Sequence, residues 1–309
     1  MKKWNIRKIF SVCIKITFLL LASLSVRQII SRKINIQNEY QETIYSQNQN
    51  YPKNNYIYND QGIIDYSNTD YGYIIIKCIK DTNNKIKVTV KSQKNEYIYS
   101  IPKNEWVSIP LTEGNGSYTI NIYENVIESK YALILTGTFN IKLLNENYPF
   151  LNSNLYVNFN NSSKIVEQAK DLTKNAKTDY EKIQKIYNFI INNISYDYEK
   201  AQNVKSGYTP KLDEILETKK GICFDYAALM CGMLRSQNIP CKLVVGYVGN
   251  TYHAWISVYV KKQDESIGGM TYYDKPNWLH MDPTYATNKS KEVIEYINNG
   301  KNYTEKYCY

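Results

Sequence analysis

Histidine is almost absent from this chain of 309 residues, where it occurs only at His253 and His280. Cysteine is also sparse, with six residues, and no two of them form a CxxC pair. Structural zinc sites usually draw their ligands from closely spaced pairs, so this spacing disfavours a zinc site. A disulfide framework is equally disfavoured, because such frameworks are typical of much shorter secreted chains. We therefore expect no metal and no cofactor, and any imidazole chemistry depends on one of two side chains.

The sequence also lacks an uninterrupted apolar run of the length that a membrane-spanning helix needs, which is about 20 residues. Its most apolar stretch covers residues 16–26 and follows a basic start that contains Lys2, Lys3 and Arg7. A basic start followed by a short apolar run is typical of an export signal. We predict that residues 1–30 are a signal peptide or, if uncleaved, an N-terminal membrane anchor. Both alternatives place the folded part outside the cytoplasm, secreted or at the bacterial cell surface.

Positive charge is not concentrated in one block, although the formal net charge is +9. A diffuse positive surface favours anionic neighbours such as cell-wall polymers or phospholipid head groups. No nucleic-acid-binding motif accompanies the charge, so nucleic acid is not an expected partner.

The composition changes twice along the chain. Residues 31–70 are rich in Asn, Gln and Tyr with little periodicity, which predicts a polar linker. Residues 71–150 contain short strand-like runs between turn residues, such as KIKVTVKS and GSYTINIYEN, at the spacing of an all-β sandwich. We therefore predict a β-sandwich-like domain there, acting either as a spacer or in adhesion and substrate presentation.

The remaining residues, 155–309, combine helical and strand-like patterns. Between residues 160 and 200, apolar residues recur at helical spacing and predict two amphipathic helices, with Ser162 and Thr178 as candidate N-caps. Strand-like runs follow the next helix, so this part is predicted to be an α+β domain.

A further helix begins at Cys223. Apolar residues recur at helical spacing from this position to about Arg235, before Pro240. The unpaired N–H groups and the dipole at a helix amino terminus stabilise a thiolate. Gly221 would let the chain turn sharply into the helix, and Cys231, two turns deeper, is expected to be an inert core thiol.

Both histidines lie in strand-like runs that follow this helix. Alternation places His253 and Trp255 on one face of the first strand, and Trp278, His280 and Asp282 on one face of the second. An antiparallel pairing would set His253 opposite Asp282, although the sequence alone does not fix the register.

The ordered motifs in this region resemble those of the bacterial transglutaminase-like superfamily, which has a fold of the papain-like cysteine-protease type. They are ISYDYE (194–199), G-x-C-x-D-Y-A (221–227), H-A-W (253–255) and W-x-x-x-D-P-T (278–284). The resemblance covers about residues 160–290. The sequence departs from the animal cross-linking enzymes in two respects. Phe224 follows Cys223 at the position where those enzymes carry Trp, and the sequence contains no Asp-rich loop suited to binding Ca²⁺. Calcium dependence is therefore not expected.

The resemblance implies a catalytic triad in which Cys223 is the nucleophile, His253 the base and then the acid, and Asp282 the residue that orients the imidazole. His280 is the competitor for His253, but it lies beside Asp282 in one strand, where their side chains do not easily bond.

Other parts of the site follow from the same comparison of motifs. The backbone N–H of Cys223 would stabilise the oxyanion, with Tyr196 as a candidate second donor. Trp255 and Trp278 are candidate walls of the substrate pocket or packing residues, rather than catalytic groups.

The expected function is that of an exported cysteine-dependent acyl-transfer enzyme acting on amide bonds of proteins or peptides, including cell-wall peptides. Its thioester would pass the acyl group to water, as in a protease or amidase, or to an amine, as in a transglutaminase. The alternative is a non-catalytic cell-surface protein in which the β domain binds and the second domain is a scaffold.

Overall fold

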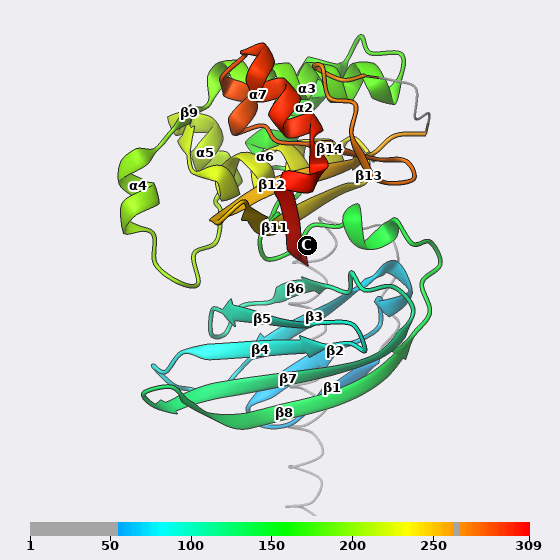
Figure 1. The fold of residues 1–309 in the computed structure, drawn as a ribbon. Coiled ribbons are helices and arrows are strands. Elements are labelled where there is room, and N and C mark those ends of the chain that lie inside the picture. Colours follow the sequence, from blue (N-terminus) through cyan, green and yellow to red (C-terminus); the bar gives the residue numbers. More distant parts are fainter. Residues whose placement is uncertain (1–54, 262–265) are drawn as a thin grey trace, which may run out of the picture. The chain divides into compact units, whose positions relative to one another are not determined.

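The computed structural model describes residues 55–261 and 266–309, which form a β domain followed by an α+β domain (Figure 1). The predicted export signal or anchor and most of the predicted linker lie outside these residues. In the described part of the chain, every helix is too short or too polar to cross a bilayer.

The β domain consists of two four-stranded antiparallel sheets, with strand orders β1-β2-β3-β6 and β5-β4-β7-β8. Its strands are β1 (Tyr56–Tyr58), β2 (Gly62–Asp65), β3 (Tyr73–Cys78), β4 (Ile86–Lys91), β5 (Glu96–Ile101), β6 (Val107–Pro110), β7 (Gly116–Ile127) and β8 (Lys130–Ile141). Buried and exposed residues alternate along β4 and β5, as expected for strands with one face in a core. The predicted β domain is confirmed.

The predicted linker, however, extends too far. From residue 55 onward the prediction is wrong, because β1 and β2 belong to the first sheet. Ile63 and Ile64 are buried, although the polar and turn-forming residues on either side of them give the sequence no strand-like pattern. Pairing with β3 supplies the stabilisation that local sequence does not reveal.

The α+β domain contains a five-stranded antiparallel sheet of order β13-β14-β12-β11-β15 and six α-helices. The strands are β11 (Cys241–Val248), β12 (Thr251–Tyr259), β13 (Tyr273–Lys275), β14 (Trp278–Met281) and β15 (Tyr303–Cys308), and β9 (Ser195–Tyr196) pairs in parallel with β10 (Lys220–Gly221). The helices are α2 (Lys164–Thr173), α3 (Asp179–Asn193), α4 (Tyr198–Asn203), α5 (Leu212–Thr218), α6 (Cys223–Ser236) and α7 (Lys291–Asn298).

The helix boundaries largely follow the sequence signals. Thr178 caps α3, accepting a hydrogen bond from the N–H of Glu181. The predicted cap at Ser162 is wrong by one residue, because α2 is preceded by Ser163 while the backbone N–H of Ser162 donates to the side chain of Asn160. Helix α6 begins at Cys223, as predicted.

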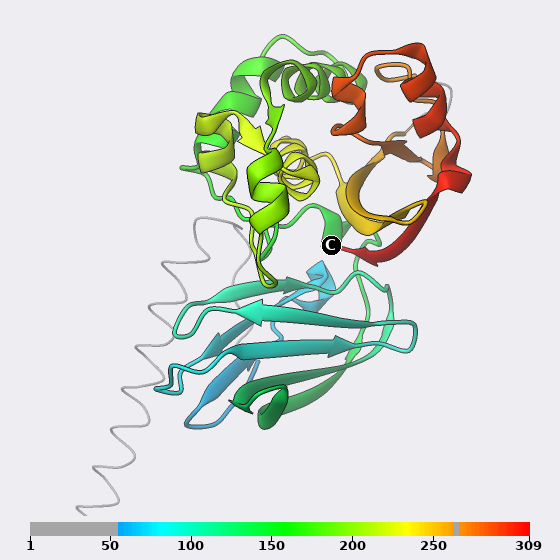
Figure 2. The same cartoon turned by 60° about the vertical axis from the view of Figure 1, so that its left-hand side comes forward.

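Helix α6 is the centre of the second domain. Figure 2 shows it in yellow, with the green helices on one side and the strands of the sheet on the other. Residues 225–235 are all buried, which is typical of a helix surrounded by packing partners. The helix contacts α2, α3 and α5 as well as β11 and β12, so its first residue is held at a fixed position relative to the sheet.

The buried guanidinium of Arg235 anchors the other end of α6. It donates to the main-chain oxygens of Cys241 at 2.7 and 2.9 Å, of Asn152 at 2.8 Å and of Tyr309 at 2.7 Å. Hydrogen bonds from a charged donor are stronger than neutral ones. Arg235 therefore fastens the nucleophile helix to β11 and to the residue that follows β15.

Candidate active site

Cys223 is the first residue of α6 and is partly exposed to solvent. Its N–H is one of the first amide groups of the helix, which have no carbonyl partner within the helix itself. The sulfur and a backbone donor therefore lie at the same helix end, where the dipole favours negative charge. The other four cysteines of the described part, Cys78, Cys231, Cys241 and Cys308, are buried.

His253 lies in β12 with only 5% of its surface exposed. Its Nε2 is 2.8 Å from Oδ2 of Asp282, which leaves Nδ1 for the hydrogen bond that the ring makes with Cys223. Burial alone lowers the pKa of His253, but the hydrogen bonds and charges of Asp282 and Cys223 outweigh it and raise the pKa to about 10. The structure thus brings the three predicted catalytic residues together, with an imidazolium between a carboxylate and a sulfur.

Asp282 follows β14 directly and is fully buried. Its Oδ2 accepts from His253 and from the hydroxyl of Tyr303 at 3.0 Å, and its Oδ1 accepts from the backbone N–H groups of Thr284 and Tyr285, both at 3.0 Å. Four donors therefore fix the orientation of this carboxylate.

The structure gives the register between the two strands, which the sequence leaves open. Ile256 pairs with Met281, so the continuation of the ladder places Asp282 level with Trp255 rather than with His253. His253 and Trp255 point to the same face because they are two residues apart. The imidazole of His253 and the carboxylate of Asp282 therefore meet between diagonally related positions of neighbouring strands. Long side chains can span the distance between such positions.

Tyrosines surround the sulfur. Tyr285 stacks on His253 with ring centroids 4.6 Å apart, and Tyr196 lies level with Gly221 in the short parallel pair. Burial raises the pKa of Tyr196, Tyr252 and Tyr285, and the nearby Cys223 adds to the effect in each. Tyr196, the candidate oxyanion donor, is thus near the nucleophile.

The two candidate pocket tryptophans lie in different places. Trp255 is buried beside the triad, with its ring 6.4 Å from that of His253. The structure does not bring Trp278 to the triad, because this ring packs against Phe150 and beneath the ammonium group of Lys242, 3.8 Å from its centroid. Trp278 therefore stabilises the fold rather than lining a pocket with Cys223.

His280 occupies an apolar environment on the same sheet. It packs edge-on against Tyr303 with centroids 4.3 Å apart, and burial lowers its pKa to about 4. The ring is therefore neutral at physiological pH. The hydrogen bond to Cys223 belongs to His253.

A buried polar cluster supports the start of α6. Asp225, which belongs to the G-x-C-x-D-Y-A motif, is fully buried and does not lie on a solvated helix face. Its carboxylate accepts from the N–H of Ile222 at 2.9 Å and from the hydroxyl of Tyr208 at 2.6 Å, and it pairs with Lys200 at 2.7 Å. The carboxylate thus caps the helix one residue before the nucleophile.

The glycine before the nucleophile helix has a different purpose from the one predicted. Its φ angle is not positive, so no sharp left-handed turn requires it. A Cβ at Gly221 would instead lie 2.6 Å from the Cβ of Asp225, which no side chain tolerates without a shift of its neighbour. Glycine therefore leaves room for the capping carboxylate.

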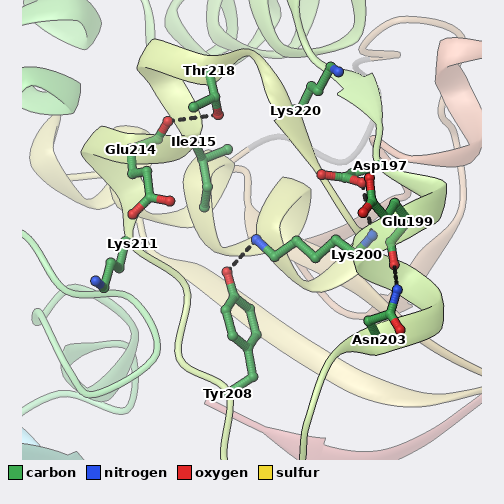
Figure 3. A pocket seen from close by; sticks show the side chains of 10 residues that line it. All are labelled: Asp197, Glu199, Lys200, Asn203, Tyr208, Lys211, Glu214, Ile215, Thr218 and Lys220. Carbon is green, nitrogen blue, oxygen red and sulfur yellow. Dashed lines mark hydrogen bonds between the residues drawn. The ribbon is translucent and has the colours of Figure 1, made fainter.

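A polar pocket opens beside this cluster, between α4 and α5 (Figure 3). Figure 3 shows Lys200 reaching across it to the hydroxyl of Tyr208, with Asp197, Glu214 and Lys220 among the lining residues. Acidic and basic side chains are mixed in the lining, so the pocket presents no single charge. Its contribution to the site is the Lys200–Asp225 ion pair in its wall.

We expect Asp225→Asn to lower the free energy of unfolding by about 2 kcal/mol, because the change leaves Lys200 without its buried partner and weakens the helix cap. A fully buried ion pair would lose more, but Lys200 is partly exposed, and solvent reduces the loss. Urea unfolding measures this change. Glu217→Gln is the matched control, since Glu217 pairs with Lys164 at an exposed position and its loss should have no measurable effect. Equal stability of both variants would contradict the supporting role of Asp225.

Comparison with known proteins identifies the class of the second domain. Residues 166–283 match the family model of the transglutaminase-like superfamily. A UPF0252 protein of Methanocaldococcus jannaschii is 30% identical over 179 residues, covering 47% of this chain and 50% of that protein. The kyphoscoliosis peptidase of Mus musculus is 33% identical over 111 residues, covering 32% of this chain and 17% of that protein. A protein-glutamine gamma-glutamyltransferase of Pseudomonas aeruginosa is 31% identical over 74 residues, covering 24% of this chain and 11% of that protein.

The second domain therefore has an α+β fold of the transglutaminase-like type, preceded by a β domain. Residues 166–283 thus form a transglutaminase-like domain, as their motifs predict. It spans half or less of the length of these relatives.

Two residues of the site carry no clear signal in the sequence. Tyr285 directly follows the D-P-T motif but is one tyrosine among 31. Tyr303 lies outside residues 166–283, and its position next to Asp282 depends on the pairing of β15 with β11. Only the folded chain reveals that contact.

Proposed function

We propose that this protein is an exported enzyme that cleaves or exchanges amide bonds of proteins or peptides through Cys223. The observation that carries the proposal is the arrangement around His253, whose two ring nitrogens face Asp282 and the only partly exposed cysteine of the described residues. A buried imidazolium held in this way stabilises the negative charge that develops on the neighbouring sulfur and can give its proton to a leaving amine.

The reaction would proceed in two steps. The thiolate of Cys223 attacks the amide carbonyl, and the N–H of Cys223 stabilises the oxyanion. The C–N bond then breaks, the imidazolium of His253 gives its proton to the leaving amine, and a thioester remains on the sulfur. In the second step, water or an amine loses a proton to His253 and attacks the thioester, which releases the acyl group and restores the thiolate. Asp282 keeps the imidazole oriented in both steps.

The location and partners of the enzyme are part of the proposal. The basic and apolar start of the chain supports export, and the diffuse charge of +9 supports contact with anionic polymers of the cell envelope. Proteins and cell-wall peptides are the amide substrates available there.

Two fates of the thioester are open to this site. One relative is named a peptidase and another a glutamyltransferase, so the superfamily supports both hydrolysis and transfer to an amine. Besides His253, the three tyrosines Tyr196, Tyr252 and Tyr285 lie close enough to Cys223 to interact with its charge, and these uncharged rings favour an uncharged acyl donor such as a peptide bond or a glutamine carboxamide.

The test is incubation of the full chain with dimethylated casein and dansylcadaverine, with Cys223→Ala as the control. We expect a Cys223-dependent product in one of three measurements: peptide fragments indicate hydrolysis of the backbone, dansyl incorporation indicates amine transfer, and ammonia without incorporation indicates deamidation. Identical behaviour of wild type and Cys223→Ala in all three, together with no acyl-enzyme detected on Cys223 by mass spectrometry, would overturn the proposal.

A further inference from the structure

We propose that strand β15 completes the catalytic arrangement, with Tyr303 as a positioning residue for Asp282. The hydroxyl of Tyr303 donates to Oδ2 of Asp282 at 3.0 Å, and this is the same oxygen that binds His253. The inference rests on the proposed function, because it assigns a role within the same triad.

Oδ2 of Asp282 has a second donor besides His253. The backbone N–H groups after Asp282 hold Oδ1 and limit the rotation of the planar carboxylate. The hydroxyl of Tyr303 adds a restraint directly on Oδ2 that does not depend on His253, so the oxygen that orients the imidazole is held by a further side chain.

Tyr303 is itself held rigidly. Its backbone pairs with Val248 on β11, and its ring packs edge-on against Trp255 and His280, with centroids 5.1 and 4.3 Å away. Burial, and then the charge of Asp282, raise the pKa of Tyr303 well above its ordinary value, so the phenol keeps its proton throughout the physiological range. It therefore acts as a hydrogen-bond donor to the carboxylate at every such pH.

The strand that carries Tyr303 is anchored to the nucleophile helix. At its far end, Arg235 of α6 binds the main-chain oxygen of Tyr309, and Tyr309 exchanges two backbone hydrogen bonds with Leu243 of β11. Arg235 therefore links the C-terminal end of α6 to the residue after β15. At the other end of β15, Tyr303 contacts Asp282 in the site. A strand outside the matched family domain thus takes part in orienting the catalytic carboxylate.

The experiment compares Tyr303→Phe with Tyr307→Phe, a control on the same strand whose ring packs against Tyr97 and Tyr309. Phenylalanine preserves the ring contacts of Tyr303, so both variants should fold. With two histidines in the chain, NMR titration of the imidazole signals follows His253 directly once His280→Gln identifies the other signal.

We expect Tyr303→Phe to lower kcat about ten-fold with an unchanged KM, because one hydrogen bond to a charged group is lost. The pKa of His253 should rise further, since a carboxylate with one donor fewer attracts the imidazolium more strongly. Tyr307→Phe should change neither quantity. An unchanged His253 titration in Tyr303→Phe would overturn the positioning role, and it needs no substrate, so it separates this inference from a failure of the proposed function.

Discussion

Cys223→Ala should abolish all turnover, and in the wild-type chain iodoacetamide at pH 6 should alkylate Cys223 before any other cysteine of the described residues. An ordinary thiol is thiolate in only about 0.3% of molecules at this pH. At pH 6 the imidazole of His253, whose pKa is raised to about 10, is positively charged and lies beside the sulfur of Cys223, where it stabilises the charge that forms on the sulfur during alkylation. The other cysteines of the described part are buried.

Peptide mapping by mass spectrometry measures the rate at each cysteine. His253→Ala is the informative variant, since it removes the positive charge while leaving the helix end, and alkylation of Cys223 should slow by at least about ten-fold. Cys231 serves as the internal control, because it lies on the same helix and is buried. Similar rates at Cys223 and Cys231 in the folded protein would favour the alternative of a non-catalytic scaffold.

The second large effect is expected from Asp282→Asn, which should reduce kcat by roughly 10²- to 10⁴-fold. Without the carboxylate, burial and the interaction with Cys223 remain as the influences on His253, so its pKa should fall from about 10. A smaller fraction of the imidazole is then charged, and Cys223 should react more slowly with iodoacetamide at pH 6.

The same substitution should change how stability depends on pH. A raised folded-state pKa of about 10 for His253 contributes stability that is complete below pH 6.5 and is lost as the pH rises through 10. Asp282→Asn should remove this loss of stability at alkaline pH. Urea unfolding between pH 6 and 10 measures this pH dependence. Asp274→Asn is the control, because Asp274 is a carboxylate of the same sheet that binds Ser257 instead of a histidine.

The alkylation experiment tests the same substitution independently. If Cys223 in Asp282→Asn reacted with iodoacetamide at the wild-type rate, the role of the carboxylate would be refuted.

Much of the architecture follows from local patterns in the sequence. Strands β3 to β8 lie within the predicted strand-rich segment 71–150, helices α2 and α3 lie within the predicted helical segment 160–200, and α6 begins at Cys223 as predicted. The three candidate triad residues lie in ordered motifs and are brought together by the fold. Their catalytic roles stay predictions.

The features that escaped prediction depend on contacts between distant parts of the chain. Strand β2 is short and flanked by polar residues, so only its pairing with β3 identifies it. Asp225 has the helical position of a surface residue, and its burial depends on Lys200 and Tyr208 from another segment. The diagonal approach of Asp282 to His253 follows from a register that alternation alone leaves open.

The position of Tyr303 late in the described chain has a consequence for how the site forms. Helix α6 and both strands that carry the imidazole and the carboxylate precede β15 in the sequence. If Tyr303 positions Asp282, then Cys223, His253 and Asp282 can lie close together before the carboxylate is fully restrained. Pairing of β15 with β11 would then be the step that completes the arrangement.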